Sequence, residues 1–300
     1  MFFKMSQSSS PSPSPSHPIG FPNIQMSCWM NSVLQLLIKS NLLTSVFTTI
    51  SRGKYNVKND ITLCKTLSLF MDSIGPIETA SKQGVKAQQG EVVQFLRAYD
   101  GVRQTMYSLH PVFQESYLND AHEVLMFVLN RLHDETSTPV NQALFNQCNV
   151  VAKQLLKDFE MKVSPIVQHV AICTEKTCTD GEVRLESHLV LFFESTHETI
   201  QHALDSAVIK QSSSLLFLSC MWVPDTSCNI NLKVNVRGHE YVLGGLVLFV
   251  QGARHYIAAV SGEGEQWFVL DDGRVKGMHV SEMFQMCNGN HPVVFMYQRV

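Results

Sequence analysis

The sequence predicts an α+β fold, because helical and strand-like patterns occupy different halves of its 300 residues. Between residues 20 and 149, apolar side chains recur mainly at the three- and four-residue spacing of helices. After residue 160 they gather instead in β-branched, aromatic or continuously apolar runs, which favour strands. Segregation of helices and strands along one chain is typical of α+β domains. A hydrophobic content of 45% and a charged content of 16% describe a globular chain with a substantial core.

The helical half begins with an amphipathic helix that starts near Cys28. Its apolar residues follow the i, i+3, i+4, i+7 pattern: Met30, Val33, Leu34 and Leu37. Two short helices are expected at 61–74 and 91–98, with glycine-containing loops around Gly84 and Gly90.

The strongest helical pattern follows Asp120, where apolar residues form one continuous stripe up to Leu132. Asp120 and Glu123 are spaced as an N-terminal capping pair, which satisfies free backbone N–H groups of the first turn. In the second half, six runs are predicted to be strands: 189–193, 215–223, 241–250, 256–260, 266–270 and 293–297. A turn within 262–264 would join two of these strands as a hairpin.

Composition argues against nucleic-acid and membrane partners. The net charge is −3, and no dense cluster of lysine and arginine occurs. The most apolar stretch, 241–250, is about half of the ~20 residues that a membrane span needs, and the N-terminal apolar run is too short for a secretory signal. We therefore expect an intracellular monomer, in the cytoplasm and/or nucleus, with its eight cysteines reduced. Residues 1–18, which are rich in Ser and Pro, are expected to form a disordered tail.

Cys28 is the first candidate for chemistry, because it directly precedes the first amphipathic helix. A thiol at a helix N-terminus lies near unpaired backbone N–H groups and the positive end of the helix dipole, and both favour the reactive thiolate. The alternative is that Cys28 is a core residue, since free cysteine is among the most buried residue types.

A candidate base and its orienting carboxylate lie 227 residues or more downstream. His255 opens one of the late strands, and Asp271 with Asp272 closes the next. A hairpin would bring His255 and Asp271 together, which supplies the imidazole and carboxylate that a cysteine protease needs. The alternative is that His255 is an ordinary strand residue and that the two aspartates only form a turn.

Three ordered motifs resemble those of the ubiquitin-specific proteases, which are papain-like deubiquitinating cysteine peptidases. The cysteine motif is matched by Gly20, Asn23, Cys28, Met30, Asn31, Ser32, Leu34, Gln35 and Leu37. The histidine motif is matched by Tyr241, Leu243, His255, Tyr256, Trp267, Asp271 and Asp272. A third motif is matched by Asp120, Ala121, His122 and Glu123. The resemblance spans residues 20 to 299.

The resemblance implies roles for these residues in the hydrolysis of the (iso)peptide bond after the C-terminal glycine of ubiquitin. Cys28 would be the nucleophile that forms an acyl-enzyme, and His255 the general base and then acid. Asp271 would orient His255, while Asp272 matches a second acid. Asn23 matches the side chain that donates to the oxyanion.

The resemblance also implies a substrate site and a division of the domain. Asp120 and Glu123 match residues that hold the basic tail of ubiquitin, although capping of their helix is an equally good explanation. The catalytic domain would span residues 19–300, with a helical thumb at 19–160, reduced fingers at 161–214 and an antiparallel β-rich palm at 215–300. The expected partners are ubiquitin or ubiquitinated proteins.

The chain departs from the family motifs beside the catalytic residues. Gln25 and Met26 replace a glycine and an asparagine before the cysteine, and Arg254 replaces the glycine before the histidine. Glycine suits a positive φ, which these side chains resist. Two alternatives therefore stay open: a catalytically impaired module that binds ubiquitin, and a protease for another ubiquitin-like modifier.

The cysteines that would form a zinc site in the fingers are mostly missing. Cys173 and Cys178 are spaced by four residues, and no second pair follows them. Structural zinc needs four ligands, which only His169 and His188 would complete. No metal or other cofactor is expected.

Overall fold

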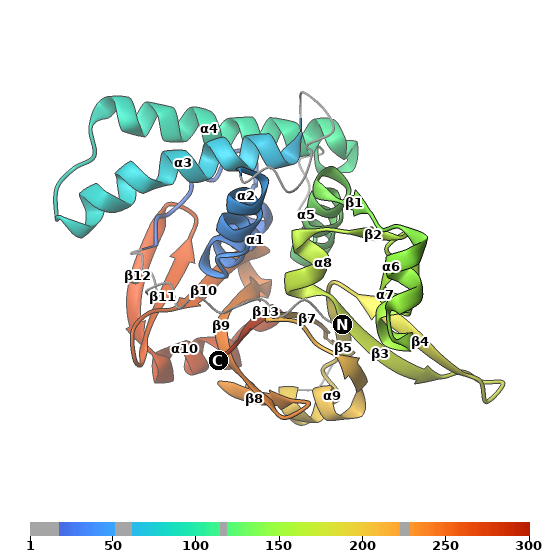
Figure 1. The fold of residues 1–300 in the computed structure, drawn as a ribbon. Coiled ribbons are helices and arrows are strands. Elements are labelled where there is room, and N and C mark those ends of the chain that lie inside the picture. Colours follow the sequence, from blue (N-terminus) through green and yellow to red (C-terminus); the bar gives the residue numbers. More distant parts are fainter. Residues whose placement is uncertain (1–17, 52–61, 115–118, 223–228) are drawn as a thin grey trace.

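A helical layer covers one face of a central sheet in the computed structural model, which describes residues 18–51, 62–114, 119–222 and 229–300 (Figure 1). The helices lie mainly in the first half of the chain and the largely antiparallel sheet in the second half. The predicted α+β class is therefore confirmed. The expected tail at 1–18 lies outside the described residues, apart from Pro18.

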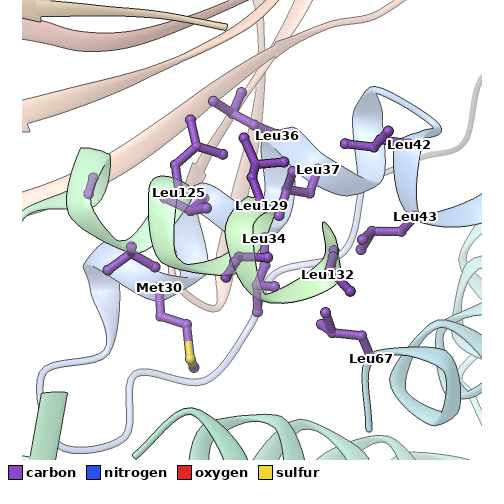
Figure 2. Close-up of a cluster of buried hydrophobic side chains, with 14 of the residues drawn as sticks. Met30, Leu34, Leu36, Leu37, Leu42, Leu43, Leu67, Leu125, Leu129 and Leu132 are labelled. Atoms are coloured by element: carbon purple, nitrogen blue, oxygen red, sulfur yellow. The ribbon is translucent and has the colours of Figure 1, made fainter. Parts of the chain in front are cut away.

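The two amphipathic helices expected from the sequence are α1 (Cys28–Lys39) and α5 (Ala121–Thr136). Their apolar stripes face each other, and α2 (Leu42–Ser51) adds to the same core (Figure 2). The central side chains of this core are at most 1% exposed: Met30, Leu34, Leu37, Leu42, Leu43, Leu67, Leu125, Leu129 and Leu132. Burial of these residues fixes the position of Cys28, which lies in the first turn of α1 and belongs to the same buried cluster.

The next two helices, α3 (Leu63–Lys82) and α4 (Gln89–Leu109), are much longer than predicted. Gly90 lies inside the first turn of α4 rather than in a loop, and α3 continues through Pro76. Tertiary packing overrides these local helix breakers, because both helices contribute to a buried aromatic cluster of Phe21, Phe70, Phe95 and Tyr99. The loop around Gly84 is confirmed, and Gly84 has a φ of +67° there.

Short elements that the sequence analysis did not resolve connect the two halves. They are the 3₁₀ helix η1 (Pro111–Gln114), the helices α6 (Gln142–Gln147), α7 (Val150–Asp158) and α8 (Pro165–Val170), and the paired strands β1 (Thr138–Pro139) and β2 (Lys162–Val163). Each of the three helices begins at an Asn or Ser whose side chain accepts a backbone N–H: Asn141, Asn149 and Ser164.

All six predicted strands occur in an eight-stranded sheet of order β12-β11-β10-β9-β13-β7-β5, with β8 paired to β9. They are β5 (Leu191–Glu194), β7 (Leu215–Met221), β9 (His239–Val250), β10 (His255–Ser261), β11 (Gln266–Asp271) and β13 (His291–Arg299). Among the named strands of the described residues, β5 and β7 alone pair in parallel. The other two strands, β8 (Lys233–Val236) and β12 (Arg274–His279), lack a long apolar run, and β12 is mostly exposed. Their pairing with apolar neighbours places them in the sheet.

Helix α1 lies on one face of the sheet, and α9 (Ile200–Ser206) and α10 (Val280–Asn288) lie on the other (Figure 1). Leu36 approaches Gly245 of β9 so closely that a Cβ there would lie 2.6 Å from its Cδ2 atom, so a larger residue at 245 would displace the Leu36 side chain. A separate three-stranded sheet of β3 (Ile172–Thr177), β4 (Val183–His188) and β6 (Val208–Gln211) extends from the body. The division into thumb, fingers and palm stays a prediction. Within the described residues, no helix has the length and apolar character of a membrane span.

Candidate active site

Cys28 is the first residue of α1, and its side chain is almost fully buried. Burial raises the pKa of the Cys28 thiol, and hydrogen bonds with the backbone of Tyr256 and of the first helical turn offset this only in part. The nearby carboxylate of Asp272 raises it further. The expectation that the helix N-terminus favours a resting thiolate is therefore wrong for this buried site, because desolvation outweighs the N–H groups. Cys28 needs a base before it can react.

The predicted hairpin of β10 and β11 is confirmed, and it brings His255 and Asp271 together. The strands pair in antiparallel register from Ala258–Leu270 to Ser261–Trp267. The His255 Nε2 atom lies 2.7 Å from the Asp271 Oδ1 atom. Because the carboxylate accepts at Nε2, the imidazole Nδ1 atom is the one left to exchange a proton with a nucleophile. The next residue, Tyr256, contacts the Cys28 thiol through its backbone, so His255 and Cys28 belong to one site.

Asp272 joins the hairpin to the segment before Cys28. Its carboxylate lies 3.6 Å from His255 Nε2 and accepts hydrogen bonds from the amides of Asn23 and Asn31, both at 2.7 Å. Burial raises the pKa of Asp272, despite these hydrogen bonds and the nearby imidazole. The carbonyl of Asp272 also accepts from the Phe21 N–H. At Gly20 a Cβ would lie 2.6 Å from the backbone of residue 273, so this junction requires glycine.

Asn23 is held at both ends of its amide. Its Oδ1 atom accepts from the Ser27 N–H at 2.9 Å, and its Nδ2 atom donates to Asp272. An amide nitrogen carries two hydrogens, so one Nδ2 hydrogen can still donate to a negatively charged oxygen near Cys28. The described geometry therefore suits the expected role of Asn23, which stays a prediction.

The three departures from the family motifs adopt the left-handed backbone region that glycine favours. The φ angles are +53° at Gln25, +60° at Met26 and +48° at Arg254. Such a conformation costs roughly 1–3 kcal/mol at a non-glycine residue and persists only where the surroundings hold it. Gln25 is held by a hydrogen bond of 2.5 Å from Arg103. The Arg254 side chain is exposed beside His255.

Residues of α4 near the site were missed by the sequence analysis. Tyr99 donates to Asn31 Oδ1 at 2.7 Å and lies 2.9 Å from Ser27 Oγ, while Arg103 contacts Gln25. Burial raises the pKa of the Tyr99 phenol far above its usual range, so it stays a hydrogen-bond donor. A signal was present, because Arg103 is a charged residue on the buried face of α4, one turn after Tyr99. A buried charge on an apolar face needs a partner.

Asp120 caps the N-terminus of α5, next to the same hairpin. Its side chain accepts from the His122 N–H at 2.9 Å, and the backbone of Ala121 hydrogen bonds to Tyr256. Burial raises the pKa of Asp120, but hydrogen bonds from His122 outweigh burial and leave it below its usual range. The capping explanation therefore holds for Asp120, whereas Glu123 is exposed.

The cysteines and histidines of the predicted fingers do not converge on one point. Cys173 is buried on β3, and Cys178 lies beyond the end of that strand. His169 lies 3.3 Å from Ser214, and His188 lies 3.0 Å from Thr174. Within the described ranges, only His255, Asp271 and Asp272 bring three metal-binding side chains together, and those residues have the partners described above.

A helical layer, a sheet and a cysteine–histidine–aspartate set at their junction define a papain-like cysteine peptidase fold. The chain belongs to the ubiquitin carboxyl-terminal hydrolase family, whose model matches residues 19–297. This confirms the family indicated by the sequence motifs.

Solved structures of deubiquitinating (DUB) modules have the same fold. The SAGA Ubp8/Sgf11/Sus1/Sgf73 DUB module bound to ubiquitin aldehyde is 15% identical, with a TM-score of 0.66 over 94% of this chain and 70% of that one. A Ubp8 variant in that module, bound to monoubiquitin, is 15% identical with a TM-score of 0.64 over 98% and 72%. A yeast SAGA DUB module with an Sgf73 mutant gives 15% and 0.60 over 94% and 68%. No curated protein sequence matches the chain.

Proposed function

We propose that this chain is a thiol-dependent deubiquitinase that hydrolyses the (iso)peptide bond after the C-terminal glycine of ubiquitin. The observation that carries the proposal is the 2.7 Å contact of His255 with Asp271. The residue after His255, Tyr256, contacts the Cys28 thiol through its backbone. Family membership and the ubiquitin-bound structures of the same fold support the choice of substrate.

The first half of the reaction forms a thioester on Cys28. The Nδ1 atom of His255 takes the thiol proton as the sulfur attacks the glycine carbonyl carbon, which is necessary because burial keeps the resting thiol protonated. Asn23 donates the free Nδ2 hydrogen to the developing oxyanion, a contact worth about 3 kcal/mol of barrier. The C–N bond then breaks, and the imidazolium gives its proton to the leaving amine.

The second half releases ubiquitin by hydrolysis. His255 takes a proton from water as the water oxygen attacks the thioester carbon, and the C–S bond breaks. The imidazolium returns the proton to the Cys28 sulfur, so the enzyme is restored without any other reactant. Throughout, Asp271 keeps the proton of the imidazole on Nε2 and stabilises its positive charge. Asp272 adds a second carboxylate at 3.6 Å.

The N-terminus of α5 supplies acidic groups for the basic tail of ubiquitin. Asp120 lies close enough to Tyr256 for its charge to affect the phenol, which places it on the Cys28 side of the hairpin. Glu123 is exposed one turn further along the helix. Opposite charges at such a position orient the substrate and raise its association rate.

A second candidate function is a ubiquitin-binding module without turnover. It is favoured by the non-glycine residues at positive φ on both sides of the site: Gln25, Met26 and Arg254. The same observation is compatible with an enzyme for another ubiquitin-like modifier. The deubiquitinase and the binding module differ in whether Cys28 reacts with the C-terminus of ubiquitin.

A ubiquitin probe with a C-terminal electrophile separates these functions. We expect a covalent adduct on the wild-type protein, none on Cys28→Ala, and a large decrease on His255→Ala. Cys148→Ala is the matched control, because Cys148 lies on the surface in a different region and its loss should leave the adduct unchanged. Ubiquitin binding without an adduct would support the binding module instead. Parallel probes made from other modifiers test the third function.

A further inference from the structure

The segment between Asn23 and Cys28 contains two consecutive non-glycine residues in the left-handed region. Gln25 and Met26 have φ angles of +53° and +60°, and both are exposed to solvent. Side chains at these angles crowd the backbone, so an isolated segment would relax to another conformation. The two ends of the segment are tied by the Ser27 N–H to Asn23 and by the Ile24 N–H to Ser27 Oγ at 3.0 Å. Neither bond involves residue 25 itself.

Arg103 of α4 supplies the contact to residue 25. Its Nη1 atom donates to Gln25 Oε1 at 2.5 Å, although the two residues are 78 positions apart. The guanidinium is itself fixed, because its Nε and Nη2 atoms donate to Asp100 Oδ1 at 3.1 and 2.6 Å. It also lies over the Tyr107 ring, 5.3 Å from the centroid. Arg103 itself is only 6% exposed, so its position is fixed by packing, and it reaches Gln25 at the surface with a charge-assisted bond.

We propose that Arg103 is a positioning residue for the oxyanion side of the active site, acting through Gln25. By holding Gln25 in the left-handed conformation, Arg103 fixes the turn that presents the Ser27 N–H to Asn23. The Ser27 N–H in turn sets the direction of the Asn23 amide, which donates to the oxyanion in the function proposed above, on which this inference rests. Arg103 touches neither substrate nor reacting atoms.

The residue at position 25 determines how much restraint the segment needs. Glycine populates positive φ freely, so residue 25 would need no restraint if it were glycine. The effect of removing Arg103 should therefore depend on the residue at position 25. A residue that only supports the general packing of α4 would lack this dependence.

The test is a double-mutant comparison with a fluorogenic ubiquitin amide as substrate. In the Gln25 protein we expect Arg103→Met to lower kcat about tenfold, less than the roughly 10²-fold loss on removing an oxyanion donor, with KM within about twofold. In the Gln25→Gly protein the same substitution should lower kcat by less than about twofold. Arg97→Met, an exposed arginine on the same helix, is the matched control and should have no effect in either background. An equal loss in both backgrounds, or no loss with Gln25, overturns the proposal.

A second substitution avoids dependence on Arg103→Met folding correctly. Gln25→Met removes the acceptor while leaving α4 untouched, and we expect it to lower kcat in the same way. Arg103→Lys retains a single donor and should show an intermediate loss. An activity of Gln25→Met equal to that of wild type would contradict the proposed contact.

Hydrogen exchange tests the positioning step without any activity. We expect Arg103→Met to accelerate exchange of the Ile24 and Ser27 amides in the Gln25 protein, and to leave it unchanged in the Gln25→Gly protein. If the wild-type protein neither hydrolyses ubiquitin amides nor reacts with the probe, the proposed function fails. The exchange rates still decide whether Arg103 holds the segment.

Discussion

The two sides of the candidate active site are held in place by different kinds of interaction. His255 and Asp271 lie on the β10–β11 hairpin, where the backbone register of adjacent strands brings them together. Asn23 lies in a loop whose conformation depends on side chains of α4, such as Tyr99, which is 72 residues beyond Ser27. The hairpin side is determined locally, and the loop side by distant partners.

This difference shows where such a site tolerates sequence change. The backbone ladder of a hairpin forms with many side chains, so its geometry changes little when neighbours vary. A loop with residues at positive φ needs specific partners, and a change at one position requires a matching change elsewhere. Asp272 belongs to both sides, since it directly follows β11 and binds Asn23 and Asn31.

The largest effect is expected on the hairpin side, from Asp271→Asn. The amide would favour the wrong imidazole tautomer without changing the strand pairing, so we expect kcat to decrease by about 10⁴-fold. The melting temperature should change little. Steady-state hydrolysis of a ubiquitin amide measures the loss.

Glu265→Gln is the control for this prediction. Glu265 also contacts an imidazole, that of His279 at 2.7 Å, and it lies in the turn of the same hairpin. Its substitution should leave kcat within twofold, which is roughly 0.4 kcal/mol. A kcat of the Asp271→Asn variant within tenfold of the wild-type kcat would show that the hairpin side does not orient His255.

The next largest effect is expected from Asp272→Asn, which weakens the connection between the two sides. Asn23 and Asn31 donate to different oxygens of the carboxylate, and the substitution replaces one of these oxygens with an NH2 donor, so one of the two hydrogen bonds is lost. Release of Asn23 should lower kcat by about 10²-fold, as for loss of an oxyanion donor. Combining Asp272→Asn with Asn23→Ala should add little to either single loss. If the loss of kcat in the double variant equalled the product of the two single losses, Asp272 would not act through Asn23.

The hairpin side of the site was predictable from sequence because its information is local. Alternating and apolar runs define β10 and β11, and the turn between them fixes which residues face each other. Cys28 was predictable in position, since the apolar pattern of α1 sets the start of the helix. The raised pKa of its thiol was not, because burial depends on how α1 packs on β10.

The loop side could not be predicted, because its conformation depends on residues that are distant in the sequence. Nothing in the residues near Gln25 indicates that an arginine of α4 will reach it, and α4 itself was predicted to be less than half of its real length. Helices α3 and α4 are joined by the aromatic cluster with Phe21, which is a tertiary interaction. The low helix propensity of Gly90 and Pro76 is therefore a poor guide to where α3 and α4 end.

A smaller effect on the loop side is expected from Tyr99→Phe. The change removes a hydroxyl that bonds both Asn31 and Ser27, which should lower kcat roughly tenfold and cost about 1 kcal/mol of unfolding free energy. Tyr241→Phe is the matched control, because Tyr241 packs in a separate buried cluster on the sheet and its hydroxyl is bonded to Ser212 and Ser213. It should cost similar stability without loss of kcat. Equal kcat losses in both variants would mean that stability, not position, decides activity.

The smallest effect concerns the α5 N-terminus, which packs against the hairpin side. The hydrogen bond with Asp120 raises the pKa of His122, so its contribution to stability is complete below the pKa of the unfolded histidine and is lost as pH rises through the folded pKa. The pKa of Asp120 is lowered in the folded protein, because bonds from His122 outweigh burial, so its contribution is present above the unfolded pKa and is lost as pH falls through the folded one. The pair therefore stabilises most at about pH 5.

Urea unfolding of wild type and His122→Asn at pH 5 and pH 8 measures this contribution. The side chains of His122 and Asp120 are 30% and 50% exposed, so solvent screening limits the difference to less than about 1 kcal/mol at pH 5. The difference should decrease toward pH 8, because the contribution of His122 is lost as the pH rises through its folded pKa. His239→Asn, an exposed histidine on β9, should show no such pH dependence. A stability difference of equal size at pH 5 and pH 8 would mean that His122 acts through packing against the Phe192 ring, 4.9 Å away, rather than through its charge.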